Sequence, residues 1–123
     1  MTTEQALEEE LRRGIQSPPY AEHLINHWTH KVTYTAGVQW LAQRAEAYWL
    51  IDAIASWQMS PEVKAEAFQS WSLRRLSSGA AILTCDDGDG RVVARQEIEF
   101  TDFPLMEVKL WLENGVLMLP SER

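Results

Sequence analysis

The 123-residue sequence has a single cysteine, Cys85, and only three lysines. One cysteine excludes an internal disulfide and is typical of a reducing compartment. The net charge of -7 argues against nucleic acid as a partner, because binding to a phosphate backbone needs a surface rich in Lys and Arg. This acidity favours solubility, and it also suits a basic protein partner.

Long apolar runs are missing too. No stretch approaches the roughly eighteen consecutive apolar residues of a membrane span, and the first residues lack a basic start followed by an apolar run. We therefore expect a cytoplasmic protein without a membrane segment. Tryptophan, in contrast, is abundant, with six residues. Such a surplus indicates either a thick aromatic core or an interface.

Apolar residues recur at helical spacing in the first half of the chain. They predict an N-terminal helical arm over residues 1–20, a short helix over 21–30, and a long helix that Thr35 caps and that runs to about Trp57. The second half of the long helix, AYWLIDAIASW, is apolar almost all round. A helix of this kind lies at the centre of a core or has a second face in a subunit contact. A homodimer through the long helix is therefore expected.

The second half of the chain changes to a period of two residues. Three strands are predicted, with the Asp-Gly pairs of DDGDG forming a hairpin turn; they lie at residues 68–76, 80–85 and 91–100. A helix is predicted over 101–113 and a short strand over 116–120. We expect an α+β fold with a long central helix packed on a three- to four-stranded antiparallel meander, a C-terminal helix and a short final strand. This single domain covers residues 21–123.

Asp52 interrupts the most apolar segment of the sequence. An ionised carboxylate in an apolar wall is costly unless it is paired, so Asp52 needs a partner or an opening to solvent. We interpret it as a structural anchor between the long helix and a neighbouring element, with Arg75 as the candidate partner. Loss of a buried pair of this kind costs roughly 3–5 kcal/mol. A ligand-binding or catalytic role for Asp52 is one alternative, and a plain solvent-facing position is the other.

The three histidines, His23, His27 and His30, lie within eight residues. On a helix their spacing puts them on one face, and two imidazoles one turn apart can reach the same ion. Asp52, Glu22 or Cys85 would complete a tetrahedral zinc shell. The pattern lacks the Glu of the metalloprotease motif and any Cys pair. The alternative is that His27 packs beside Trp28 while the other two histidines are solvated, and on balance we expect no cofactor.

Trp40 and Trp57 lie off the main apolar stripe of the predicted long helix. If both are exposed, they form an apolar patch that marks an interface; if the N-terminal segment covers them, they belong to the core. Arg44 lies two turns before Asp52, close to the same stripe. A candidate binding surface therefore consists of Trp40, Trp57, Asp52 and Arg44.

Several segments together carry a family resemblance: the helix start YT-x-GV-x-x-LA, then YWLIDAIAS, LTC-x-DG-x-G, FTDFPL and LENGVLMLPSE. With these motifs, residues 27–122 resemble a family of small bacterial proteins of unknown function that also occur on phages and plasmids. The resemblance implies a single intracellular domain and a link to mobile elements. It implies no chemistry, and the first 25 residues lie outside it.

Two functions of different classes are compatible with these patterns. The first is a non-enzymatic protein-binding module, in its specific form an inhibitor encoded by a mobile element that binds a host defence protein. The second is a small metal-dependent enzyme or ligand-binding protein that uses His23, His27 and His30 with Asp52. We favour the first, because the sequence shows no complete catalytic set.

Overall fold

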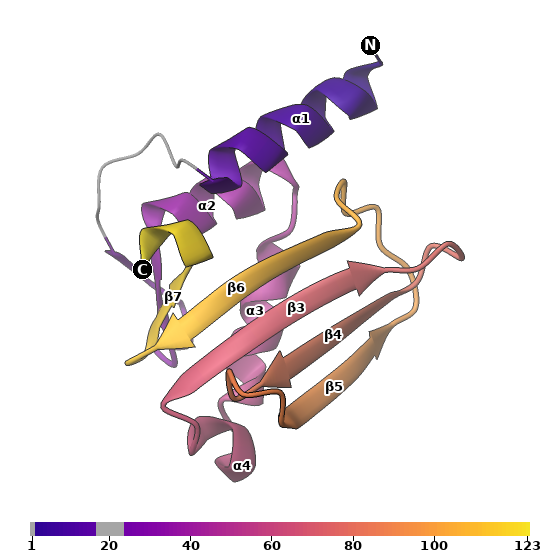
Figure 1. Cartoon of the computed structure of the whole chain (residues 1–123). Coiled ribbons are helices and arrows are strands. Elements are labelled where there is room, and N and C mark those ends of the chain that lie inside the picture. The colour runs from indigo at the N-terminus through magenta and orange to yellow at the C-terminus, as the bar shows by residue number, and fades with distance from the viewer. Residues whose placement is uncertain (1, 17–23) are drawn as a thin grey trace.

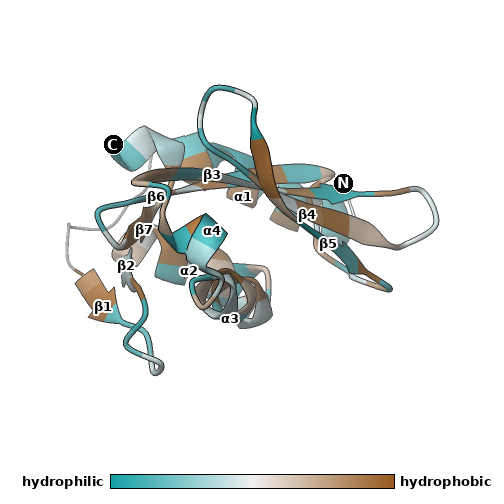
Figure 2. Ribbon diagram, turned by 90° about the horizontal axis from the view of Figure 1, so that it is seen from below, coloured by the Kyte–Doolittle hydropathy of each residue, from teal (hydrophilic) through white to brown (hydrophobic). Residues whose placement is uncertain are grey.

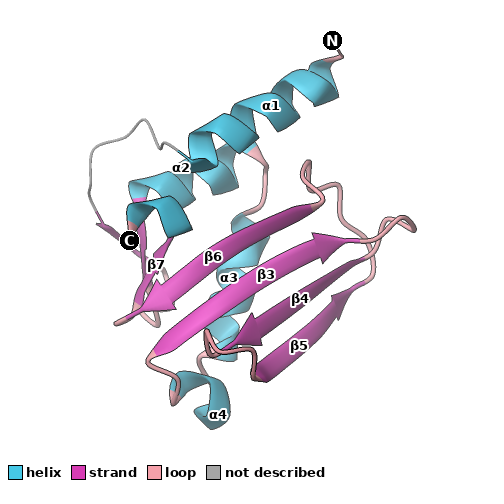
Figure 3. Cartoon of the chain, in the orientation of Figure 1, coloured by secondary structure: helices cyan, strands magenta, loops and turns pink. Residues whose placement is uncertain are grey.

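A computed structural model describes residues 2–16 and 24–123. The helices are short (Figure 3): α1 (Thr3–Gln16), α2 (Ala36–Arg44), α3 (Tyr48–Trp57), α4 (Pro61–Lys64) and a final 3-10 turn, η1 (Pro120–Glu122). The strands are β1 (Leu24–Asn26), β2 (Thr33–Thr35), β3 (Phe68–Arg75), β4 (Ala81–Asp86), β5 (Val92–Ile98), β6 (Glu107–Glu113) and β7 (Val116–Met118).

All seven strands form one sheet in the order β1-β2-β7-β6-β3-β4-β5. The β2–β7 pair is parallel and the other pairs are antiparallel, so the sheet is mixed. Helices α2, α3 and α4 lie on one side of this sheet (Figure 2). The core lies between the two layers, where alternate residues of the central strands pack on α3; among these strand residues are Trp71, Leu73, Leu83, Cys85 and Leu110.

The predicted fold class is wrong in two respects. The expected long helix is two helices, because the chain turns between α2 and α3, where Glu46 takes a left-handed conformation with φ of 53°. The expected C-terminal helix is the strand β6, which pairs with β3 from Phe68↔Glu113 to Arg74↔Glu107. Over residues 2–16 and 24–123 the fold is therefore α+β with four short helices and a seven-stranded mixed sheet. It does not contain a long central helix on a three- to four-stranded meander.

Other elements agree with the sequence. The strands β3, β4 and β5 form the predicted meander, and β7 is the predicted final strand. Thr35 caps α2, because its hydroxyl accepts a hydrogen bond from the Val38 amide at 3.2 Å. The short helix expected over 21–30 is wrong, since β1 and a turn occupy residues 24–30.

Two of the motifs that carry the resemblance meet at the start of α2. The Thr35 hydroxyl donates a hydrogen bond to Glu122 Oε1 at 2.7 Å, and the amide of Leu119 donates to the same oxygen at 2.8 Å. A Cβ at Gly37 would lie 2.7 Å from Glu122 Oε2. Gly37 therefore lets a carboxylate approach the N-terminus of a helix, where negative charge is favourable.

A pair of buried amides joins α3, α4 and β3. The side chains of Gln58 and Gln69 donate to each other's carbonyl oxygens, each at 2.9 Å. Gln69 also donates to the Val63 carbonyl and accepts from the Trp71 indole, while Gln58 donates to the Ile54 carbonyl. This network satisfies polar groups in the core, as burial requires.

The helix α1 packs on α2 and η1 (Figure 1). Its Leu11 is fully buried, and a Cβ at Gly14 would lie 1.9 Å from the ring of Trp40. The missing side chain at Gly14 therefore allows α1 to approach the Trp40 ring closely. The rest of the expected arm, residues 17–20, lies outside the described residues. No helix in the described part is long and apolar enough to cross a membrane.

Candidate functional site

Asp52 has partners, but they come from the loop between β1 and β2 and not from the central sheet. Its Oδ1 lies 2.7 Å from His27 Nε2 and accepts a hydrogen bond from Trp28 Nε1 at 3.1 Å. The expected partner, Arg75, instead donates to the Phe103 carbonyl at 2.6 Å. Asp52 thus connects α3 to a loop that precedes it by about twenty-five residues in the chain.

Local hydrogen bonds hold this loop in a tight turn. The His27 amide donates to the Val32 carbonyl at 3.0 Å, and the His30 amide donates to the His27 carbonyl at 2.8 Å. His30 takes a left-handed conformation with φ of 61°. These bonds fix the backbone on both sides of His27, so its ring points at α3.

The hydrogen bonds of His27 define its tautomer. Its Nδ1 accepts from the amide of Thr29 at 3.2 Å, and the Thr29 hydroxyl lies 2.7 Å from the same nitrogen. Because a backbone N–H can only donate, Nδ1 is the acceptor and the ring proton lies on Nε2. His27 is 4% exposed, so a buried imidazole N–H is directed at the Asp52 carboxylate.

The carboxylate itself opens to solvent. The Asp52 side chain is 52% exposed, and within the described residues its Oδ2 has no hydrogen-bond partner. Trp28 is 75% exposed, and Tyr48, one turn before Asp52 on α3, is 44% exposed. We call Trp28, Asp52 and Tyr48 the aromatic–carboxylate surface.

Tyr34 on β2 lies behind this surface. Burial raises the pKa of its phenol, and the proximity of Tyr48 and Asp52 raises this pKa further. The phenol therefore stays protonated at neutral pH. The buried side of the surface is composed of neutral groups, and Asp52 supplies its negative charge.

The arrangement of Thr29, His27 and Asp52 contains a hydroxyl, an imidazole and a carboxylate, the residue types of a nucleophilic triad. The hydroxyl is, however, part of the turn, because it also accepts a hydrogen bond from the Lys31 amide at 3.2 Å. It orients the imidazole from within the same loop. These contacts fix the Asp52 carboxylate relative to the β1–β2 loop.

The histidine spacing does not produce a shared helical face. His30 is exposed and its Nδ1 lies 2.8 Å from the side-chain nitrogen Nδ2 of Asn26, whereas His27 is directed at Asp52. His23 lies outside the described residues. Across 2–16 and 24–123, no three His, Cys, Asp or Glu side chains are grouped so that they could hold a metal ion.

The other residues of the expected binding surface lie apart. Trp40 is 7% exposed beneath α1, and Arg44 forms an ion pair with Glu10 of α1 at 2.6 Å. The N-terminal helix thus covers Trp40, the second of the two alternatives. Trp57 is part-buried and donates from its indole nitrogen to Gln96 on β5 at 2.8 Å.

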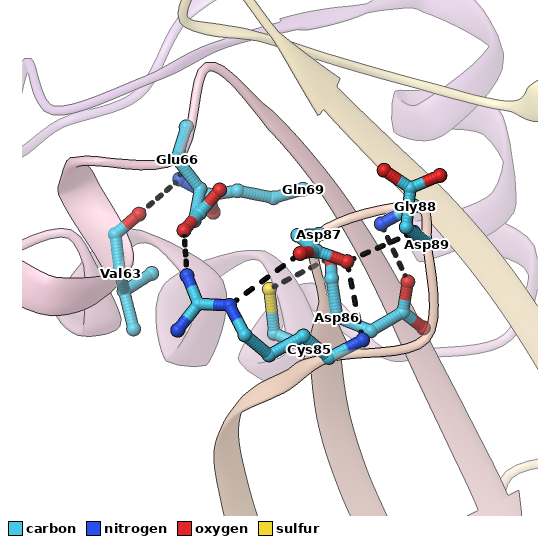
Figure 4. Close-up of polar contacts among 9 residues, drawn as sticks. Val63, Glu66, Gln69, Cys85, Asp86, Asp87, Gly88 and Asp89 are labelled. Carbon is cyan, nitrogen blue, oxygen red and sulfur yellow. Dashed lines mark hydrogen bonds and ion pairs between the residues drawn. The ribbon is translucent and has the colours of Figure 1, made fainter.

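Cys85 and the DDGDG turn serve the fold (Figure 4). Burial raises the pKa of the Cys85 thiol to about 12, and Asp86, Glu66 and Asp87 add to this shift. In the turn, Asp87 Oδ1 accepts from the amides of Asp89 and Arg91, which lowers the pKa of the Asp87 carboxyl. The turn is the predicted hairpin, and the raised pKa keeps the thiol protonated at neutral pH.

The signal for this site was partly present in the sequence. Asp52 in an apolar helix predicted a hydrogen-bonded partner, and His27 beside Trp28 was noted as a pair. Helical spacing also places Tyr48 beside Asp52, four residues before it in the sequence. Tyr34 was missed as a member of the cluster.

The fold and the site define a small α+β protein whose mixed sheet carries helices on one side and whose β1–β2 loop presents an aromatic–carboxylate surface. The chain belongs to DUF6876, a family of unknown function, whose model matches residues 5–123. The expected membership of an uncharacterised family is confirmed. The family includes α1, contrary to the expectation that the first 25 residues lie outside it. No curated protein and no solved structure matches the chain.

Proposed function

We propose that the protein is a non-enzymatic protein-binding module that holds a cationic side chain of a partner, Arg or Lys, on the aromatic–carboxylate surface. The observation that carries this proposal is that Asp52 is held by two hydrogen bonds and is still half exposed. One of its oxygens accepts from His27 and Trp28, while the side chain is 52% exposed and the neighbouring Trp28 and Tyr48 are exposed too. A guanidinium or ammonium group is the complement of such a surface.

Two kinds of interaction support this partner chemistry. A carboxylate forms its strongest hydrogen bonds with charged donors. Aromatic faces attract cations, most strongly in Trp, and exposed examples contribute about 0.5–1 kcal/mol. Trp28 is hydrogen-bonded to Asp52 through its indole, and Tyr48 lies one turn before Asp52 on α3.

The buried partner of Asp52 adds preorganisation. The His27 Nε2–H and the Trp28 indole hold the carboxylate in one orientation before any partner arrives. Less side-chain entropy is then lost on binding. The net charge of -7 also attracts a basic partner from a distance.

The narrower form of the proposal is an inhibitor, encoded by a mobile element, that binds a host defence protein. This form requires that the host protein present an Arg or Lys in an accessible position. The expected homodimer through the long helix loses its basis, since α3 buries Leu50, Ile51 and Ile54 against its own core.

The test uses argininamide as the probe and citrullinamide, its neutral isostere, as the matched ligand. In a ¹H–¹⁵N titration, argininamide is expected to shift the Trp28 indole N–H in a saturable manner, and citrullinamide is not. The shift should disappear in Asp52→Ala and weaken in Tyr48→Ala. Met59→Ala, which removes a side chain that is 74% exposed elsewhere, serves as the control variant.

Equal shifts with both ligands, or a response that survives in Asp52→Ala, would contradict the proposal. The metal-dependent alternative has its own readout. Zinc that co-purifies with the chain and is lost in His27→Ala would favour a metal site over a cation-binding surface.

A further inference from the structure

The strand β5 forms one end of the sheet. Among the described residues it pairs only with β4, and Figure 1 shows no element beyond it. The strand has seven residues without proline or lysine, which protect many natural edge strands, and its register shift against β4 lies at the Val92 end, outside residues 94–98. Its outer backbone groups are therefore available to another strand.

The exposed side chains of β5 carry opposite charges two residues apart. Arg95 is 54% exposed and Glu97 is 74% exposed, and they form an ion pair within the strand at 3.0 Å. Because successive side chains of a strand point to opposite faces, both lie on the face opposite to Gln96, which accepts a hydrogen bond from Trp57 of α3. A strand with the order cation, Gln96, anion is complementary to an antiparallel copy of itself.

We propose that β5 pairs with β5 of a second copy of this chain, antiparallel and with the two-fold axis at Gln96. In this register Arg95 lies opposite the partner's Glu97, and Glu97 lies opposite the partner's Arg95. Ala94 faces the partner's Ile98. The two sheets then become one continuous sheet.

In this register the paired segment covers residues 94–98, because β5 ends at Ile98 and its pairing with β4 shifts register beside Val92. Neighbouring symmetric registers are disfavoured, because centring on Arg95 or on Glu97 puts like charges directly opposite.

The experiment reverses the charges one at a time. Sedimentation velocity of the full chain over a concentration series measures the dimer dissociation constant. Because of the two-fold axis, each single variant, Arg95→Glu or Glu97→Arg, replaces two favourable pairs with two repulsive ones. We expect the dissociation constant to rise by about tenfold or more. The double variant Arg95→Glu/Glu97→Arg restores complementarity and should dimerise like the wild type.

A mixture of the two single variants provides the sharpest test, because their strands complement each other. The mixture should form a heterodimer although each variant alone is largely monomeric. This result also shows that both variants are folded. Arg74→Glu, an equal charge change at a residue that is 71% exposed on β3, should leave the dimer unchanged.

Three results would overturn the proposal. The first is a wild-type chain that remains monomeric up to about 1 mM, where even weak association is visible. The second is a dimer that neither single variant weakens. The third is a mixture of single variants without heterodimer.

Discussion

Replacing Asp52 by Ala and by Asn separates the contributions of the two hydrogen bonds that Asp52 accepts, one from His27 and one from Trp28. In Asp52→Ala the Trp28 indole, which is largely exposed, can bond to water. The His27 Nε2–H cannot, because the ring is 4% exposed. An unpaired buried donor costs about 1–3 kcal/mol, and we expect the free energy of unfolding to fall by that amount.

In Asp52→Asn the amide oxygen can still accept both hydrogen bonds. The loss is then the difference between a charged and a neutral acceptor, about 0.5–1 kcal/mol. This value is well below the roughly 3–5 kcal/mol expected for a fully buried pair, because the Asp52 side chain is 52% exposed and solvent screens its charge.

Urea unfolding followed by far-UV circular dichroism measures both variants. Tyr48→Ala on the same face of α3 is the control for loss of exposed surface alone, and it should change the free energy of unfolding by about 0.5 kcal/mol or less. A loss below about 0.5 kcal/mol in Asp52→Ala would refute the assignment of His27 as a buried donor to Asp52. Equal losses in the Ala and Asn variants would refute it as well.

Three further predictions concern the rest of the chain. The Cys85 thiol should react with a thiol reagent only on unfolding, because burial raises its pKa to about 12; rapid labelling of the folded protein would contradict this. Gly14→Ala should lower the free energy of unfolding by about 1–3 kcal/mol, since the new methyl group meets the Trp40 ring, whereas Arg13→Ala, a change at an exposed site, should have little effect. The turn amides lower the pKa of Asp87 below its usual 3.8. The stability that this carboxylate contributes is therefore present above pH 3.8 and is lost as the pH falls below it. Between about pH 5 and pH 3 the melting temperature of Asp87→Asn should fall by less than that of the wild type.

The meander was predictable because its signals are local. Alternating side chains in β3, β4 and β5 and the Asp-Gly turn agree with one another. The β6 segment carries two patterns at once. Leu105, Val108 and Leu112 have helical spacing, while Val108, Leu110 and Leu112 alternate as in a strand. Pairing with β3 selects the strand over the helix. This pairing depends on residues far away in the sequence, so the local pattern of β6 does not reveal it.

Trp111 shows the consequence of that choice. A helix would put it on the same stripe as Leu112, but in the strand it lies on the opposite face. There its ring packs edge-on against Phe68 at 5.5 Å, and the Arg123 guanidinium lies over it. The break at Glu46 was equally invisible, because neither glycine nor proline marks it.

For the candidate site, the sequence predicted that Asp52 needs a hydrogen-bond donor, but it did not identify the residues that donate. Asp52 in an apolar segment required a donor, and the structure supplies His27 and Trp28. The metal-site hypothesis depended on a helix over residues 21–30, which would put the histidines on one face. The hydrogen bonds of the β1–β2 loop determine where His27 points, and such loop geometry depends on long-range packing.

The buried amide pair of Gln58 and Gln69 has a consequence for the choice among alternative structures. If β3 shifted by one residue, Phe68 or Ser70 would replace Gln69 on the inner face. Gln58 and the Trp71 indole would then lose the partners that they have in the native register. The amides therefore select one alignment of the central strand against its neighbours. A pair of apolar side chains at these positions would lose no hydrogen bond in a shifted alignment and would discriminate less against it.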